Sequence, residues 1–305
     1  MIEINNLSVE FSGDVKAIDS LSLVVPGGKK TLIIGESGSG KSVLLAAMLQ
    51  ILPPSAKVSG SITLGGIELL SLSEKQMESV RGEAMSYIPQ GSGNSMNPLL
   101  TVGYQVAEPL IEKKRIPKKA ALISAVEWMK KLNLGNEAKL ASAYPHTLSG
   151  GMRQRALISM GAISGAPVLL ADEPTKGLDG ERVETVTDLF LALDDRTILC
   201  VSHNLNFVET IADLVCVMYS AQQVEYCTNS EFFSEPLHPY SRMILDAMPE
   251  NGLKANMGFA PTHKGLESIG CHFYSRCPHR SDRCQLAPPL VEKHGRKVRC
   301  WLYAD

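Results

Sequence analysis

The segment GESGSGKS, residues 35–42, is suited to binding phosphate. Its glycines allow the backbone to wrap with N–H groups turned inward, toward anionic oxygens. Lys41 can reach the β- and γ-phosphates of a nucleotide, and the Ser42 hydroxyl can bind Mg²⁺. An apolar β-rich stretch precedes the loop and a helical pattern follows it, so a P-loop is favoured over a flexible Gly/Ser loop. The predicted phosphate site consists of Gly35, Ser37, Gly38, Ser39, Gly40, Lys41, Ser42 and Val43.

Two adjacent carboxylates follow a second apolar stretch, PVLLADEP at residues 167–174. Its apolar core predicts a buried parallel strand, and ligands of open α/β sheets bind at the carboxyl ends of such strands. Asp172 at that end can hold Mg²⁺, directly or through water. Glu173 can polarise an attacking water as a general base. Together with a P-loop, the two acids favour ATP hydrolysis over a simple acidic helix start.

Two more polar residues follow β-like stretches. His203, at the end of TILCVSHN, can contact a γ-phosphate if its strand joins the same sheet, although a lone histidine is more often structural. Gln90, in MSYIPQG, can bind Mg²⁺ or a water of the ion. Both residues are therefore candidates for the nucleotide site.

A second glycine-rich helix start lies in HTLSGGMRQRALISMGA, which predicts another anion site at Ser149, Gly150 and Gly151. Arg153 and Arg155 in the first turns oppose the helix dipole, so another interaction must account for them. Since the P-loop already cradles the phosphates of one nucleotide, this second site is explained if it completes a site on another subunit. The simpler alternative is a helix cap with Ser149 as the capping residue.

The seven cysteines fall into two groups. Cys200, Cys216 and Cys227 lie in or beside apolar segments and are expected in the core. The other four form a C-x5-C-x6-C-x15-C pattern in the tail. Structural zinc usually has tighter C-x2–4-C spacing, so the pattern favours a [4Fe–4S] cluster, with zinc or free thiols as alternatives. The four cysteines are Cys271, Cys277, Cys284 and Cys300, and the basic residues expected to offset a cluster's charge are Arg276, Arg280, Arg283, Arg296, Lys297 and Arg299.

The composition is that of an ordinary globular protein: 305 residues, 44% hydrophobic and 20% charged. A net charge of −2 gives no reason to expect nucleic acid as a partner. The N-terminus MIEINNLSVEF shows no secretory signal, and the apolar runs are too short for a membrane span. These features predict a cytosolic chain, in which a disulfide framework is not expected.

The chain is predicted to have α/β organisation. An α/β core is expected over residues 1–90 and 163–230, with a helix-rich segment over about 91–162 that includes PKKAALISAVEWMKKLNL. The stretch 249–270 has the composition of a linker.

Together, these motifs resemble those of an ATP-binding subunit of an ABC transporter. GESGSGKS matches Walker A, Gln90 the Q-loop, LSGGMRQR the signature, VLLADE Walker B, GLD the D-loop, and His203 the switch histidine. The resemblance implies a P-loop NTPase (RecA-like) core with an ABC β-subdomain and a helical signature subdomain, over residues 1–230. It also implies a head-to-tail dimer that binds two ATP molecules, with Asp179 and the signature acting across the dimer. Phe11 matches the aromatic that stacks on adenine, although a core strand position would explain it nearly as well.

Further stretches resemble the oligopeptide/dipeptide/nickel importer subfamily: SGNSMNPLLTVGYQVAEPL, EPLHPYSRMILDAMP and the cysteine tail. The resemblance implies that residues 231–305 form a C-terminal extension, which in some members holds an iron–sulfur cluster. It also implies a related second ATPase subunit, two transmembrane permease subunits, an extracytoplasmic solute-binding protein, and a place on the cytoplasmic face of the membrane. Asn204 stands where the family usually has Asp, and Lys176 and Gly177 alter the D-loop.

The expected activity is ATP hydrolysis that drives import of peptides or a related small solute. Nickel or metallophore import is the alternative cargo, and a soluble non-transport ABC ATPase is the alternative class. A P-loop small-molecule kinase would not explain the signature. The sequence does not indicate the cargo, which this subunit is not expected to touch.

Overall fold

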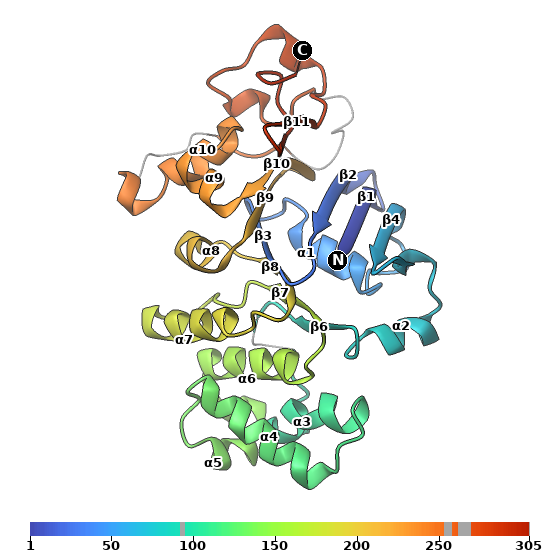
Figure 1. Cartoon of the computed structure of the whole chain (residues 1–305), viewed down its shortest axis with the longest axis vertical. Coiled ribbons are helices and arrows are strands. Elements are labelled where there is room, and N and C mark those ends of the chain that lie inside the picture. Colours follow the sequence, from blue (N-terminus) through green and yellow to red (C-terminus); the bar gives the residue numbers. More distant parts are fainter. Residues whose placement is uncertain (92–94, 253–257, 262–269, 305) are drawn as a thin grey trace. The chain divides into compact units, whose positions relative to one another are not determined.

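The computed structural model describes residues 1–91, 95–252, 258–261 and 270–304 (Figure 1). Most of the linker expected over 249–270, and the first three residues of SGNSMNPLL, lie outside the described residues. The chain divides into two compact units. Unit 1 comprises residues 1–26, 31–71 and 212–305, and unit 2 comprises residues 27–30 and 72–211.

Unit 1 contains an antiparallel sheet with strand order β2-β1-β4-β5 and a second strand series β11-β12-β10-β9-β3. In the second series β3 and β9 are parallel, whereas the other neighbours are antiparallel. The strands are β1 (Ile2–Phe11), β2 (Val15–Val25), β3 (Lys30–Ile34), β4 (Lys57–Leu64), β5 (Ile67–Glu68), β9 (Leu214–Tyr219), β10 (Gln222–Thr228), β11 (Val291–Lys293) and β12 (Arg296–Val298).

The C-terminal extension is built into unit 1. β12 pairs with β10, opposing Val298 to Glu225, so the tail extends the same sheet. Val298 and Cys300 also pack with Leu237 in a small apolar cluster. The helices of unit 1 are α1 (Lys41–Met48), α9 (Asn229–Ser234) and α10 (Pro239–Asp246), with short 3₁₀ turns at Tyr274–Arg276 and Asp282–Gln285 in the tail.

Unit 2 contains three parallel strands in the order β8-β7-β6: β6 (Met85–Ile88), β7 (Val168–Asp172) and β8 (Thr197–Val201). Every residue of β7 and β8 is buried, as expected for parallel strands covered on both faces. The helices are α2 (Glu74–Val80), α3 (Val102–Glu112), α4 (Lys118–Lys131), α5 (Glu137–Ala141), α6 (Gly150–Ile163), α7 (Gly180–Leu191) and α8 (Leu205–Ile211).

Helices α3, α4, α5 and α6 pack together, and α6 also packs against β6 (Figure 1). α4 lies inside the stretch predicted to be helical, and α6 begins at the signature glycines. Cys200, Cys216 and Cys227 are buried, as predicted. None of the helices in the described part of the chain has both the length and the apolar character needed to cross a bilayer.

Candidate functional site

The P-loop lies in unit 1 between β3 and α1, and its shape depends on glycine at two positions. A Cβ at Gly35 would lie 2.0 Å from the Met218 carbonyl oxygen, and one at Gly40 would lie 2.2 Å from that of Ala17. Both glycines also have positive φ, at 147° and 102°. The loop is therefore pressed against its neighbours, and larger residues at these positions would deform it.

The side chain of Lys41 is 5% exposed and folds back over the loop. Its Nζ donates to the carbonyl oxygens of Gly35 and Glu36, both at 2.7 Å, and to Ser39 Oγ at 3.3 Å. These contacts place the ammonium group inside the loop, where it suits an anion. Ser37, Gly38 and Ser42 are exposed, whereas Ser39 is buried and Val43 is half-buried.

Phe11, the expected adenine contact, is half-buried at the end of β1, where it pairs with Val15 of β2. Its stacking role remains a prediction.

The predicted catalytic residues lie in unit 2, at the carboxyl ends of its parallel strands. Asp172 ends β7 and is 2% exposed, and Glu173 follows it at 7% exposed. Glu173 Oε1 lies 2.7 Å from His203 Nε2, and Oε2 lies 3.6 Å from Lys176 Nζ. The backbone of Glu173 has φ +50°, an unusual value for a residue with a side chain. The structure thus brings the predicted base and the predicted γ-phosphate contact together.

The raised pKa values of two neighbouring groups indicate a negative potential around Asp172 and Glu173. Burial raises the pKa of the Cys200 thiol, and the charges of Asp172 and Glu173 raise it further. Burial and the charge of Asp172 raise the pKa of Tyr87 to about 12. Such a site suits a cation, and a carboxylate such as Asp172 is a preferred Mg²⁺ ligand.

Gln90 lies two residues beyond β6 and is exposed. Since β6 and β7 are parallel, with Ile88 opposite Ala171, Gln90 emerges at the same sheet edge as Asp172. Asn204, where the family usually has Asp, begins α8: its Oδ1 accepts from Phe207 N–H at 3.1 Å. Asparagine caps helices about as well as aspartate, so this departure keeps the local fold.

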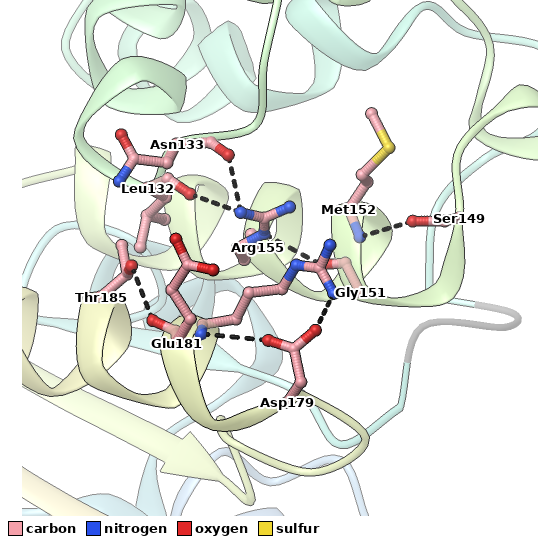
Figure 2. A network of polar contacts seen from close by, with 10 residues as sticks. Leu132, Asn133, Ser149, Gly151, Met152, Arg155, Asp179, Glu181 and Thr185 are labelled. Atoms are coloured by element: carbon pink, nitrogen blue, oxygen red, sulfur yellow. Dashed lines mark hydrogen bonds and ion pairs between the residues drawn. The ribbon is translucent and has the colours of Figure 1, made fainter.

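The signature segment forms the exposed N-terminus of α6 (Figure 2). Ser149 is the capping residue and accepts from Met152 N–H at 3.3 Å, as the simpler alternative predicted. Ser149 and Gly150 are exposed. The cap and the proposed contact across subunits are compatible, because capping uses one acceptor of the hydroxyl and leaves the Gly150 surface open.

The sequence indicates that some further interaction must account for Arg155 near the helix start, and the structure shows which interaction this is. The side chain is 5% exposed and donates to the carbonyl oxygens of Leu132 at 3.0 Å and Asn133 at 2.6 Å. These carbonyls lie just beyond the last residue of α4, so Arg155 satisfies a helix C-terminus (Figure 2).

The D-loop lies against the signature within unit 2. Asp179 caps α7 by accepting from Arg182 N–H at 3.2 Å and also pairs with the Arg182 guanidinium. A Cβ built on Gly151 would lie 3.5 Å from Leu178 Cδ2, in ordinary contact. The predicted contacts across subunits therefore share one region of unit 2 (Figure 2).

The four tail cysteines line one cavity of about 110 Å³, together with His238, Phe273 and Trp301 among others. All four are free thiols. Burial raises the pKa of the Cys271 thiol to about 11 and raises those of Cys277 and Cys300. Among the described residues, no group of three or more His, Cys, Asp or Glu side chains is placed to hold a metal ion.

Several basic residues expected to offset a cluster's charge have other partners. Arg276 pairs with Glu36 of the P-loop at 2.8 Å. The guanidinium carbon of Arg283 lies 4.2 Å from the Trp301 ring centroid, and Arg299 donates to the Gln223 carbonyl at 3.1 Å. Sequence reasoning missed the first of these contacts, because no local signal links residues 240 positions apart.

Comparison with known proteins agrees with these motifs. The family described as ABC transporter matches residues 18–176, and the one described as oligopeptide/dipeptide transporter, C-terminal region, matches residues 224–284. The oligopeptide transport ATP-binding protein AppD of Bacillus subtilis (strain 168) is 37% identical, with 100% of this chain and 97% of that protein covered. OppD of Salmonella typhimurium, another oligopeptide transport ATP-binding protein, is 36% identical, with 95% and 90% covered.

A solved structure supports the same assignment. The ATP-binding cassette MJ0796, a dimer in a post-hydrolysis state bound to ADP and Pi, matches with a TM-score of 0.69 and 25% identity. The match covers 75% of this chain and 99% of that one. The fold is therefore that of a P-loop NTPase cassette. The chain belongs to the ABC transporter family, in the group that contains ATP-binding proteins such as AppD and OppD.

Proposed function

We propose that this chain is the ATP-hydrolysing subunit of an importer for peptides or a related small solute, bound peripherally at the cytoplasmic face of the membrane. The similarity to oligopeptide transport proteins over the whole chain supports the class of cargo. The contact of 2.7 Å between Glu173 and His203, beside the buried Asp172, carries the proposal of hydrolysis. Nickel or metallophore import is the alternative cargo.

Each motif residue has a role in this proposal. Lys41 and the loop amides hold the phosphates, while Ser42, Asp172 and Gln90 provide Mg²⁺ ligands, directly or through water. Mg²⁺ supplies positive charge that offsets charge developing on the phosphates. Glu173 accepts the proton of the attacking water, and His203 is close enough to orient that carboxylate.

The proposed partners follow from the same family membership. A second, related ATPase subunit would receive the exposed Ser149, Gly150 and Gly151 surface, with Asp179 beside it. ATP hydrolysis would drive conformational change in two permease subunits, and a solute-binding protein would deliver the cargo from outside the cell membrane. No nucleic-acid partner is proposed.

The test is Glu173→Gln in the assembled transporter. The variant keeps the shape of the side chain but cannot accept a proton, so ATP binding should persist while hydrolysis falls by about 10²-fold or more. A closed, ATP-bound dimer should accumulate. Glu181→Gln, which removes an exposed carboxylate from α7, is the matched control and should hydrolyse normally. Near-normal turnover in Glu173→Gln would reject the assignment.

We further propose that Cys271, Cys277, Cys284 and Cys300 hold a [4Fe–4S] cluster with a structural role. Their shared cavity supports this proposal. A zinc ion bound by the same four sulfurs is the alternative. Anaerobic purification with iron, sulfide and zinc analysis is the test, and four alkylatable thiols without metal would reject both groups.

A further inference from the structure

The second residue of the P-loop, Glu36, is held by the C-terminal extension. Arg276 Nη2 lies 2.8 Å from Glu36 Oε1, and Nη1 donates to Oε2 at 3.0 Å. Two parallel contacts of this kind fix the carboxylate in orientation as well as in position. The Arg276 side chain is 5% exposed and that of Glu36 is 37% exposed, so water screens the pair only in part.

Arg276 is itself fixed by buried aromatic residues. Nη1 donates to the Tyr219 hydroxyl at 3.2 Å. The guanidinium carbon lies 5.6 Å from the centroid of the Tyr219 ring and 5.8 Å from that of Phe273. Both rings are at most 1% exposed. The guanidinium of Arg276 is therefore held in a fixed position where it contacts Glu36, unlike the mobile side chain of an exposed arginine.

A second contact holds the backbone of Glu36. The N–H of Glu36 donates to the hydroxyl of Tyr240 at 2.9 Å. Tyr240 is fully buried in α10, and its ring centroid lies 4.5 Å from that of Tyr219. The same aromatic group thus fixes both the backbone and the carboxylate of Glu36.

The electrostatic consequence concerns phosphate binding. The loop attracts anions through its N–H dipoles and the Lys41 ammonium. Glu36 adds a negative charge to this loop, and a carboxylate free to move toward the phosphates would repel them. Arg276 both neutralises this charge and prevents its movement.

We propose that Arg276 is a positioning residue for nucleotide binding: it neutralises Glu36 and holds it away from the phosphates, so that the C-terminal extension sets the ATP affinity of the P-loop. This inference rests on the proposed function, in which the P-loop binds ATP. The alternative is that the pair only stabilises the fold of unit 1.

The experiment measures binding of a non-hydrolysable ATP analogue with Mg²⁺ to the full-length chain. Arg276→Gln should raise the Kd about tenfold, equivalent to about 1.4 kcal/mol, because the carboxylate becomes uncompensated. Glu36→Gln alone should bind at least as tightly as the parent, because it removes a negative charge from the loop while the positive charge of Arg276 remains beside it. Glu36→Gln combined with Arg276→Gln should bind within about twofold of the parent, since no carboxylate remains to be neutralised. The melting temperature of each variant is measured beside the Kd, because an arginine that only stabilises unit 1 would lower the melting temperature and leave the Kd of the folded protein unchanged.

Controls separate the possible failures. Arg280→Gln changes an exposed arginine of the same tail and should leave the Kd unchanged. Arg276→Lys keeps the charge, should weaken binding two- to threefold with the same rescue, and replaces Arg276→Gln if that variant does not fold. Normal affinity in the Arg276 variants, or a double variant as weak as Arg276→Gln, overturns the inference alone. Unchanged binding in Lys41→Ala overturns the proposed function and the inference together.

Discussion

At the scale of single residues, the backbone of Glu173, the proposed catalytic base, carries strain. Glu173 has φ +50°, and a non-glycine residue in this region costs about 1–3 kcal/mol. Its N–H donates to the Val201 carbonyl at 2.9 Å, and its carbonyl accepts from Lys176 N–H at 3.1 Å. These bonds hold the strained backbone and aim the carboxylate at His203. The strain therefore accompanies the geometry on which the proposed reaction depends.

Lys176 offers a test at the same scale, because this D-loop residue pairs with Glu173 at 3.6 Å. The ammonium group holds one carboxylate oxygen of Glu173 and so competes with the attacking water for it. Lys176→Thr should therefore raise kcat for ATP hydrolysis two- to threefold and leave KM unchanged. The gain is small because the lysine side chain is 59% exposed, and exposed pairs contribute at most about 1 kcal/mol. Steady-state ATPase assays give the answer.

The control for this prediction is Lys139→Thr, which removes an exposed lysine from α5 and should not change kcat. Slower turnover in Lys176→Thr would mean instead that the lysine assists the reaction.

Candidate roles could be assigned from the sequence where several functional residues lie close together in one motif. The P-loop and the acid pair were found from spacing, because their chemistry needs neighbours in sequence. The contacts of Glu36 were not predictable, since Arg276 is 240 positions away. The reason for Arg155 was also missed, because burial decides it and the helix dipole does not.

At the scale of elements, α6 contains one glycine whose substitution should affect function and another whose substitution should affect folding. A Cβ at Gly151 would make only ordinary contacts, the nearest at 3.5 Å, whereas one at Gly161 would lie 2.4 Å from Ile88 Cγ1. Gly151→Ala should therefore leave the melting temperature nearly unchanged. It should still lower ATP turnover of the assembled transporter about tenfold, because the methyl group intrudes on the proposed contact with the second ATPase subunit.

Gly161→Ala, in the same helix, is the contrasting variant, and it should lower the melting temperature because its methyl group would clash with Ile88 of β6. Thermal unfolding and turnover assays on both variants check the pair of predictions. Full turnover in Gly151→Ala would show that the helix start has no role across the dimer.

Elements with strong local patterns were predicted well. β7 and β8 were predicted from short apolar runs, and α4 lies within a stretch expected to be helical. The pairing of β10 with β12 was not predicted. Short strands paired across a long stretch of chain leave little local signal, so the tail was expected as an extension and its part in the sheet was missed.

At the scale of the whole molecule, unit 1 is closed by contacts between early and late segments. Asp19 N–H in β2 donates to the Ala221 carbonyl at 2.8 Å, and Gln222 Nε2 donates to Asp19 Oδ2, also at 2.8 Å. The phosphate-binding loop therefore belongs to a unit assembled from both ends of the chain. Its stability should depend on such contacts more than on local propensity.

Asp19 provides a test of this closure. Burial opposes its charge, but hydrogen bonds from Gln222 and Lys16 and the charge of Lys16 outweigh burial and lower the pKa of Asp19 below 3.8. As pH falls, Asp19 of the unfolded chain takes up a proton near pH 3.8, whereas Asp19 of the folded chain does so only at lower pH. The stabilisation that charged Asp19 gives to the fold is therefore present above pH 3.8 and is lost as pH falls through the folded pKa. Asp19→Asn should therefore cost about 1 kcal/mol at pH 7 and progressively less below pH 3.8.

The measurement is urea unfolding at pH 7 and at pH 3, followed by tryptophan fluorescence. The chain has two tryptophans, so a Trp128→Phe background leaves Trp301 as a reporter of unit 1. Asp14→Asn is the matched control, because Asp14 is exposed and asparagine tolerates its φ of +59°. A loss of stability in Asp19→Asn that is equal at both pH values would show that the aspartate acts through shape and not through its charge.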